Sequence, residues 1–521
     1  MGWIPTVPGM VPTGGNSLAG WDWAVLTVYL IILIGTSLLV ARRPKDSRDY
    51  FVGHGHMPSW AVALSVLASA MSVATVLGAP QQAFAGNLTY LSANIGTILA
   101  VLIVAMWFIP AFYRQQVVTV YELVGNRFGP GAKQAASWTF LLGRMLASGA
   151  RLFMAAIPVA MMLGGDGHDV GLLGIGILGL AAVSVTCTLA GGIASIIWTD
   201  VVQFLVLIVA VIAVLILLWL RIPADAGQVA EVLATAGVNG VSKLTVLDYS
   251  TDLTRPYTLL TAVTGVMLLN LAVYGTDQDL AQRMLTCRNA VAGGRSALLA
   301  IVLNLPMVLL FMIIGLLLFV FYGQPQLMGA AMPVYQPASS EGAFLVFIMR
   351  ELPPGMAGLM LAGIFAISLT STLSAVNAMA ATFINDSYRH WRPACTDAHY
   401  LRVGRLAVVA SGAALALVAA ACVFWQQANG QALIDFALGV MVLPYSGLLG
   451  VFLCALFTRR GNGVSAIAAL IIGFMSALAM QPWAWHWWAA TLPLAWPWHM
   501  VVGTGLSFFT CCLGRRRAEI S

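Results

Sequence analysis

The long apolar segments constrain this chain more than any other feature of its sequence. Thirteen segments are apolar over about the twenty residues that a helix needs to cross the hydrocarbon core of a bilayer. Because lipid offers no hydrogen bonds, each segment has to pair its own backbone groups, which favours helices. We therefore predict an all-α polytopic membrane protein. The predicted spans are 22–41, 59–85 (broken), 90–113, 135–163, 171–190, 194–220, 257–279, 296–322, 355–387, 403–425, 433–457, 463–481 and 499–514.

Charged residues are rare, and their positions suggest an orientation. Only 8% of the residues are charged, against about 25% in soluble domains. Most of the 25 lysines and arginines fall in alternate loops, which the positive-inside rule assigns to the cytoplasm. This places the N-terminus outside and the C-terminus inside, and we expect an integral protein of the bacterial inner (plasma) membrane. Nucleic-acid binding would need a basic face or stripe, and the sequence contains none. It also contains no soluble domain that could act as an enzyme, so we expect neither a nucleic-acid partner nor catalysis.

Polar residues interrupt two of the predicted spans. Residues 366–377 carry five hydroxyls and an amide, and residues 69–72 place small and polar side chains inside another span. Polar groups are expensive in a bilayer and usually face a bundle interior or a water-filled cavity. Hydroxyl and carbonyl oxygens suit a small hard cation. Interrupted spans in both halves of the chain predict the ion and substrate site of a transporter.

Two arginines lie inside the fourth span. Arg144 and Arg151 are seven residues apart and share one helical face. Arg144 lies nearer the cytoplasmic start of the span, where it could pair with a carboxylate or extend to the surface. Arg151 lies deeper, and its guanidinium would suit the carboxylate of an anionic substrate.

Three aspartates lie at the ends of spans. Asp200 needs a cation, a proton or an arginine beside it, so an ion site and a structural ion pair both remain open. Asp277 and Asp279 lie near another cytoplasmic helix end, where helix-end contacts and gating salt bridges are expected.

Six stretches, in order over most of the chain, resemble the sodium:solute symporter family. Members of that family import sugars, proline, pantothenate, monocarboxylates or sialic acids together with Na⁺. The resemblance implies the inverted-repeat leucine-transporter fold, with five helices in each repeat, one extra helix before them and two after. The matching stretches are 48–53, 72–80, 118–129, 191–203, 276–283 and 370–388.

The resemblance also implies an organisation of the chain. The expected parts are an extracellular N-terminus, first helix and basic loop (1–56), the first repeat (57–220), an extracellular loop (221–256), the second repeat (257–460), and two peripheral helices with a short basic tail (461–521).

The family's main sodium site transfers to five positions of this chain. The resemblance implies backbone carbonyl ligands from Ala68, Met71 and Ile367, and hydroxyl ligands from Thr370 and Ser371. These positions agree with the oxygen-rich stretches found from the sequence itself.

A second sodium is less well supported. The resemblance implies Asp200 and Ser374 as its ligands, but Leu373 stands where a two-sodium site could want another hydroxyl. We therefore favour a single sodium, with Na⁺ as the only metal and no organic cofactor.

The substrate is expected near the middle of the membrane. Ser72 and Thr75 match substrate-contacting positions of the broken helix, and Arg151 resembles the carboxylate anchor of sialic-acid members. Asn94 and Asn270 are further polar candidates, each inside an apolar span.

The predicted function is Na⁺-coupled uptake of a small organic solute by alternating access. Ala70 and Ala74 replace polar side chains of the sugar-transporting members, which disfavours a neutral sugar and favours a smaller or anionic solute. With Arg151, we expect a carboxylate of the sialic acid, monocarboxylate or amino acid type. Two alternatives are a transporter-like sensor acting on a partner, and a proton-coupled transporter with Asp200 as the proton carrier. The expected partners are the solute, Na⁺ and the lipid bilayer.

Overall fold

The computed structural model contains helices at all the positions predicted as spans. It describes residues 18–40, 57–165, 167–190, 193–238, 241–333, 337, 342–429, 432–481 and 494–515. The family-like stretch 48–53 and most of the C-terminal tail lie outside these residues.

The first half of the chain forms helices up to a long connection. These elements are α1 (Gly20–Val40), α3 (Ser59–Ala70), α4 (Val73–Ala85), η1 (Thr89–Ser92), α5 (Ala93–Ile103), η2 (Val104–Phe108), α6 (Ile109–Gln115), α7 (Tyr121–Phe128), α8 (Pro130–Met162), α9 (Val170–Ala190), α10 (Ile193–Arg221) and α11 (Ala226–Thr235), followed by the short antiparallel strands β1 (Gly237–Val238) and β2 (Val241–Ser242).

The second half is likewise helical. Its elements are α12 (Leu259–Thr261), η3 (Ala262–Val266), α13 (Met267–Thr276), α14 (Gln278–Leu285), α15 (Ala290–Gly323), α16 (Pro325–Met328), η4 (Gly329–Ala331), α17 (Ala343–Arg350), α18 (Met356–Thr382), η5 (Phe383–Tyr388), α19 (Arg389–Trp391), α20 (Asp397–Asn429), α21 (Leu433–Phe457), α22 (Gly463–Ala479) and α24 (Trp496–Leu513).

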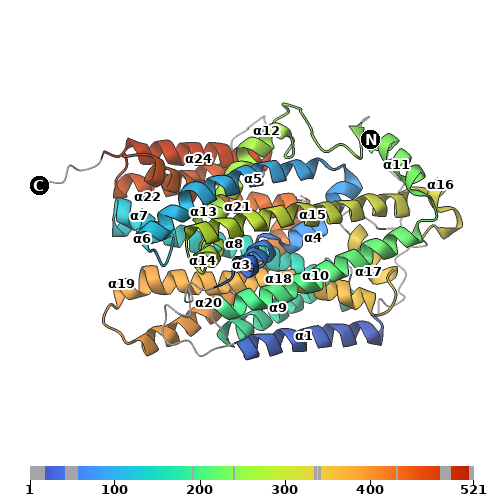
Figure 1. The fold of residues 1–521 in the computed structure, drawn as a ribbon, viewed down its shortest axis with the longest axis horizontal. Helices are drawn as coiled ribbons and strands as arrows, with labels where there is room; N and C mark the ends of the chain where they lie inside the picture. Colours follow the sequence, from blue (N-terminus) through green and yellow to red (C-terminus); the bar gives the residue numbers. More distant parts are fainter. Residues whose placement is uncertain are drawn as a thin grey trace, which may run out of the picture.

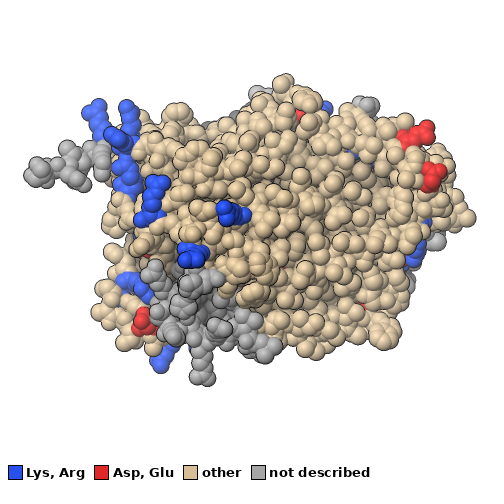
Figure 2. Space-filling view, in the orientation of Figure 1, with Lys and Arg blue, Asp and Glu red and all other residues tan. Residues whose placement is uncertain are grey.

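Within the described residues, ten helices are long and apolar enough to cross a membrane, and the bent pair α3 and α4, taken as one span, makes eleven. The last two predicted spans correspond to α22, which has 17 residues, and α24, which has 18. They lie at the predicted positions, but thirteen membrane crossings and their orientation stay a prediction. Figure 2 shows Lys and Arg gathered at the end of the bundle where α6, α7 and α19 lie, as the proposed cytoplasmic side requires.

Helix α18 lies at the centre of the bundle and is almost wholly buried, although it carries the polar stretch (Figure 1). The first helix is attached to its N-terminus. Asp22 accepts hydrogen bonds from the backbone N–H groups of Gly355 (2.8 Å) and Gly358 (2.7 Å), which satisfies donors that a helix start leaves unpaired. A Cβ at Gly358 would lie 2.5 Å from the backbone of Asp22, so this close packing requires glycine.

The predicted break in the second span is confirmed. Helix α3 ends at Ala70, and Met71 (ψ 145°) and Ser72 (φ −137°, ψ 165°) are extended before α4 begins. The two helices bend by 64° at this point. Because the helical hydrogen-bond ladder stops here, the last carbonyls of α3 lose their intrahelical partners.

The expected interruption at residues 366–377 was wrong. Helix α18 runs without a break from Met356 to Thr382, because the hydroxyls of Ser371, Thr372 and Ser374 bond back to carbonyls of their own helix and replace solvent. The second interruption lies in the seventh span instead. Asp277 (ψ 121°) separates α13 from α14, and its side chain caps the N–H of Asp279.

Candidate sodium and substrate site

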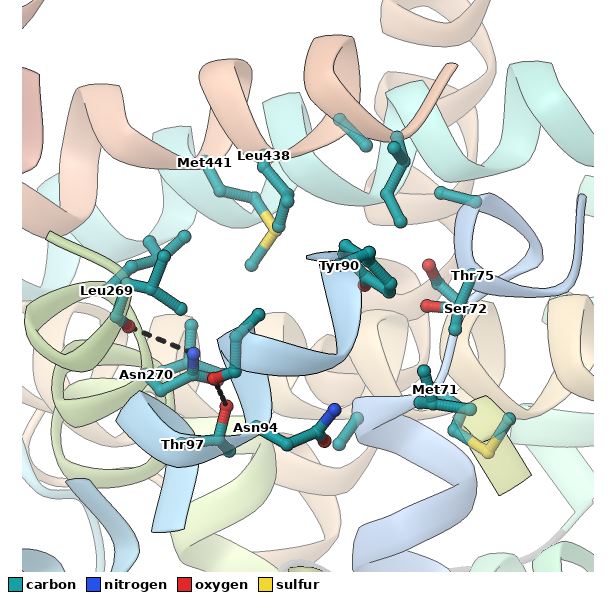
Figure 3. A pocket seen from close by; sticks show the side chains of 18 of the residues that line it. Met71, Ser72, Thr75, Tyr90, Asn94, Thr97, Leu269, Asn270, Leu438 and Met441 are labelled. Carbon is teal, nitrogen blue, oxygen red and sulfur yellow. Dashed lines mark hydrogen bonds between the residues drawn. The ribbon is translucent and has the colours of Figure 1, made fainter. Parts of the chain in front are cut away.

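All five predicted substrate residues line one cavity beside the helix break. Ser72 and Thr75 come from the start of α4, Asn94 from α5, Arg151 from α8 and Asn270 from α13. Figure 3 shows these elements around the cavity, with the hydroxyls of Ser72 and Thr75 on one wall and Asn94 and Asn270 on another. Met441 and Leu438 of α21 close a further side.

Arg151 presents a buried charge to this cavity. Arg151 is only 7% exposed, and it donates an N–H of its guanidinium to the sulfur of Met441 at 3.4 Å. Its Nε has no hydrogen-bond partner. Within the described parts of the chain, no carboxylate forms an ion pair with Arg151. A buried cation that lacks an anion is costly, so an anionic ligand would lower its free energy.

On the wall of the cavity built by α5, α13 and α15, three of the polar groups are asparagine amides. Asn304 donates to the Oδ1 of Asn94 at 3.0 Å, and the amide group of Asn94 donates to the carbonyl of Leu91. Asn270 donates to the carbonyl of Val266 at 3.0 Å. The remaining amide atoms of Asn270 and Asn304 can hydrogen-bond hydroxyl or amide groups of a solute.

Aromatic side chains close the cavity near the predicted outer side. Tyr90 and Tyr257 pack edge to face with ring centroids 5.0 Å apart. Tyr257 donates a hydrogen bond to Asp435 at the start of α21, and Gln82 of α4 donates to the same carboxylate at 3.4 Å. These contacts join the outer half of the broken helix to α21, so opening of the cavity on this side has to break them.

The predicted sodium ligands come from the end of α3 and from α18, two helices that pack against each other. The carbonyl of Ala68 belongs to the unpaired end of α3, and Met71 also borders the substrate cavity. Thr370 is fully buried and donates its hydroxyl hydrogen to the Oε1 of Gln203 at 2.5 Å. The lone pairs of the Thr370 oxygen remain available to a cation. Ser371 donates to the carbonyl of Ser368 at 3.1 Å and leaves its oxygen in the same state.

The fifth predicted ligand, Ile367, is fully buried one turn before Ser371 on α18. A helical carbonyl has two lone pairs and can accept a cation beside its backbone hydrogen bond. The chemistry of the five oxygens therefore fits Na⁺.

A buried network of ion pairs lies on the basic side of the cavity. Arg144 pairs with Asp277 (2.9 Å) and with Asp279, and Arg283 pairs with Asp279 and with Asp200 (3.0 Å). We call these five residues the aspartate–arginine network. Arg144, Arg283 and the three aspartates are all at most 2% exposed. The salt bridges expected at Asp277 and Asp279 are present. Of the two arginines on α8, Arg144 is the one that pairs with these carboxylates.

The structure does not bring Asp200 and Ser374 together directly. Asp200 accepts from Ser65 at 2.5 Å and from Arg283 at 3.0 Å, whereas Ser374 donates to Asp279 at 3.1 Å. Arg283 forms ion pairs with both Asp200 and Asp279, so its guanidinium lies between the two proposed second sodium ligands, Asp200 and Ser374. Asp200 thus forms an ion pair with Arg283, as one of its two open interpretations predicts.

Sequence reasoning missed Asn304, Gln203, Tyr257 and Arg283. Asn304 carried the same signal as Asn270, an amide inside an apolar span, and could have been found. Gln203 and Arg283 lie within family-like stretches, but their partners are more than 80 residues away in sequence. Tyr257 is the first residue of the predicted span 257–279, and a tyrosine is common at such an interface, so it gave no signal of a site.

Comparison with known proteins identifies the family of this chain. The model of the sodium:solute symporter family matches residues 50–473. The sodium/sialic acid symporter SiaT of Proteus mirabilis (strain HI4320) is 27% identical over 467 residues, covering 88% of this chain and 89% of that protein. The sodium/iodide cotransporter of Homo sapiens is 28% identical over 490 residues, covering 91% of this chain and 71% of that protein.

Solved structures show the same fold. A Na⁺-coupled sialic acid symporter in a substrate-bound outward-open state superposes with a TM-score of 0.80 at 23% identity, covering 95% of this chain and 97% of that one. A transporter of the nucleobase-cation-symport-1 family in a closed conformation gives 0.55 at 12% identity, covering 91% of this chain and 95% of that one.

The fold and the cavity define a secondary transporter of the inverted-repeat class. Because the family model matches most of its length, the chain belongs to the sodium:solute symporter family. It is an integral membrane transport protein of the bacterial plasma membrane type and not an enzyme.

Proposed function

We propose that this protein imports a small carboxylate-bearing solute together with Na⁺. The observation that carries this proposal is the buried guanidinium of Arg151, which faces the cavity without a carboxylate partner among the described residues. An arginine fork matches a carboxylate in bidentate geometry. Sialic acids, monocarboxylates and amino acids all carry that group, and SiaT is named for a sialic acid.

The other lining residues would orient the rest of the solute. Ser72 and Thr75 offer hydroxyls from the helix break, and Asn94, Asn270 and Asn304 offer an amide wall. A solute with hydroxyl or amide groups beside its carboxylate would use both walls. A neutral sugar would leave Arg151 unpaired and is disfavoured.

Sodium would couple to the solute through the broken helix. Na⁺ held by Ala68, Met71, Ile367, Thr370 and Ser371 would join α3 to α18 and fix the extended residues at the break. Since Ser72 follows Met71 directly, an ion at this point organises the adjacent substrate wall. Closure of the cavity on its outer side and opening on its basic side would then release Na⁺ and the solute to the cytoplasm.

We favour one sodium in each cycle. Arg283 already supplies a positive charge between Asp200 and Asp279, where a second cation would be expected to bind. The same ion pair disfavours Asp200 as a proton carrier, because protonation of Asp200 would break its ion pair with Arg283 and leave that buried guanidinium with one carboxylate fewer. A signalling role without transport has no specific support in the structure.

The test is Na⁺-dependent binding and uptake by purified protein in proteoliposomes. Sialic acid and pyruvate would each be compared with the neutral methyl ester, with Na⁺ replaced by K⁺ or by a proton gradient. We expect Na⁺-dependent uptake of a carboxylate and not of its ester. Arg151→Lys should weaken binding because the bidentate fork is lost, and Arg151→Ala should cost about 2–5 kcal/mol, as for loss of one partner of a buried pair.

Arg221→Ala provides a matched control, since Arg221 is 51% exposed in its side chain at the end of α10. Equal affinity for acid and ester, or a fully active Arg151→Ala protein, would contradict the carboxylate assignment. Uptake driven by a proton gradient without Na⁺ would contradict the coupling ion instead.

A further inference from the structure

A groove on the lipid-facing side of the bundle has the chemistry of a phospholipid site. It is lined by Leu189 of α9 and by Arg402, Arg405, Leu406 and Val409 of α20. Helices α9 and α20 pack directly against each other (Figure 1). The four α20 residues recur at intervals of three or four, so they share one face of the helix.

The two arginines lie at the depth of the lipid headgroups. Residues 406–425 of α20 contain no charged residue. Twenty helical residues rise about 30 Å, which is the thickness of the hydrocarbon core. Arg402 and Arg405 directly precede this stretch, so they stand at its boundary on the side where most Lys and Arg gather (Figure 2).

The guanidinium groups are exposed, and the described residues give neither of them an ion-pair partner. Helix α9 contains no acidic residue, and Asp397, the one acid of α20, points away from the face of Arg402 because it lies five residues earlier. The groove therefore carries two positive charges. Below them, Leu406 (68% exposed) and Val409 (47% exposed) offer apolar surface that an acyl chain can cover.

We propose that this α9–α20 groove binds an anionic phospholipid, with its phosphate on Arg402 and Arg405 and an acyl chain along Leu189, Leu406 and Val409. Basic pockets between transmembrane helices on the cytoplasmic side suit such headgroups. Arginine provides several donors to one phosphate. A zwitterionic lipid would bring an ammonium group to a groove whose lining residues include no carboxylate, so net negative charge should be preferred.

The site is independent of the transport cavity. Both helices that form it pack against α18, which carries the proposed sodium ligands, but no residue of the groove lines the cavity. A lipid bound here would hold α9 and α20 together at the cytoplasmic side.

The test is lipid retention by the full-length protein, measured by native mass spectrometry. Detergent-purified protein would be titrated with phosphatidylglycerol or phosphatidylcholine of identical acyl chains. Each arginine near an anionic membrane surface contributes about fivefold in affinity, so the Arg402→Gln/Arg405→Gln variant should bind phosphatidylglycerol about thirtyfold more weakly. Arg402→Lys/Arg405→Lys keeps the charge and should lose less.

Arg459→Gln/Arg460→Gln is the matched control, because these exposed arginines lie on the same basic side but do not line the α9–α20 groove. A Leu406→Trp variant fills the groove and keeps both charges, and it should also reduce retention. Retention of phosphatidylglycerol at the wild-type level by the double glutamine variant, or equal retention of both lipids by the wild type, would overturn the proposal. A Na⁺-dependent thermal shift like that of the wild type verifies that each variant is folded.

Discussion

Lys243 binds the outer end of the broken helix, and we predict that replacing it will loosen that end by an amount that can be worked out from its contacts. Its ammonium donates to the carbonyls of Ala83 (3.2 Å), Phe84 (2.7 Å) and Gly86 (2.8 Å), where α4 ends. It also lies 4.0 Å from the ring centroid of Phe319 and is 2% exposed. A lysine from the predicted outer loop thus caps the C-terminal end of α4.

The magnitude follows from two opposing contributions. Burial lowers the pKa of Lys243 from 10.5 to about 8. At about 1.36 kcal/mol for each tenfold change, the ammonium costs about 3.4 kcal/mol more here than in water, yet it stays protonated at pH 7. Three hydrogen bonds from a charged donor contribute about 1.5–3 kcal/mol each, or about 4.5–9 in total. The net contribution of Lys243 is therefore about 1–6 kcal/mol.

Lys243→Met keeps the apolar stem and removes the three donors. We expect the amides at the end of α4 to exchange hydrogen at least about fivefold faster at pH 7, the lower limit of that range. Arg255→Met is the control, because Arg255 lies in the same loop but has a side chain that is 53% exposed. Unchanged exchange in Lys243→Met, or the same acceleration in Arg255→Met, would refute the capping role.

The lowered pKa also predicts a pH dependence. The pKa of Lys243 in the folded protein lies below that of free lysine. Burying the charged ammonium therefore lowers the free energy of unfolding by its full amount below about pH 8, and this loss disappears as the pH approaches 10.5. Stability due to this group should therefore rise with pH, by about 1.3 kcal/mol between pH 7 and pH 9. Thermal unfolding of the wild type at the two pH values should show this rise relative to Lys243→Met. A parallel response of both proteins would contradict it.

Three further changes test the site. Thr370→Ala or Ser371→Ala should raise the Na⁺ concentration for half-maximal uptake strongly without reducing membrane insertion, and unchanged Na⁺ curves in both variants would remove them from the sodium site. Asp200→Asn should lower thermal stability, since breaking a buried ion pair costs about 3–5 kcal/mol, while the Na⁺ curve stays hyperbolic; a measured ratio of two Na⁺ per solute would contradict the single sodium. Asn304→Ala leaves the oxygen of Asn94 unpaired and should weaken solute binding by about 1–2 kcal/mol in a binding titration, with Na⁺ affinity unchanged.

The spans and the broken helix could be predicted because their signals are local. A bilayer requires apolar length, and small polar residues at 69–72 cannot continue an apolar helix without a partner. The break at Asp277 could not be predicted in the same way. Its carboxylate accepts hydrogen bonds from Arg144 and Tyr445, which are more than 130 residues away in the chain.

The polar stretch of α18 shows the opposite error. Its hydroxyls looked like an interruption, but in a fully buried helix they bond to carbonyls one turn earlier and to neighbouring helices. Among the cavity residues, Ser72 and Thr75 were predicted from the family resemblance, and Asn94, Arg151 and Asn270 were predicted because each is a polar group inside an apolar segment. The distinction between Arg144 and Arg151 needed the structure, since only tertiary packing decides which arginine meets the aspartates.

The charge inventory of the site gives a physical reason for coupling. The aspartate–arginine network contains three carboxylates and two guanidinium groups, so with all groups ionised it carries −1. Arg151, two helical turns from Arg144, brings the sum to zero. A carboxylate solute alone would leave this buried region at −1, and Na⁺ alone would leave it at +1. In a low-dielectric interior, either state is unfavourable. Binding both restores neutrality, so each proposed ligand lowers the cost of the other, and linkage makes that effect equal in both directions.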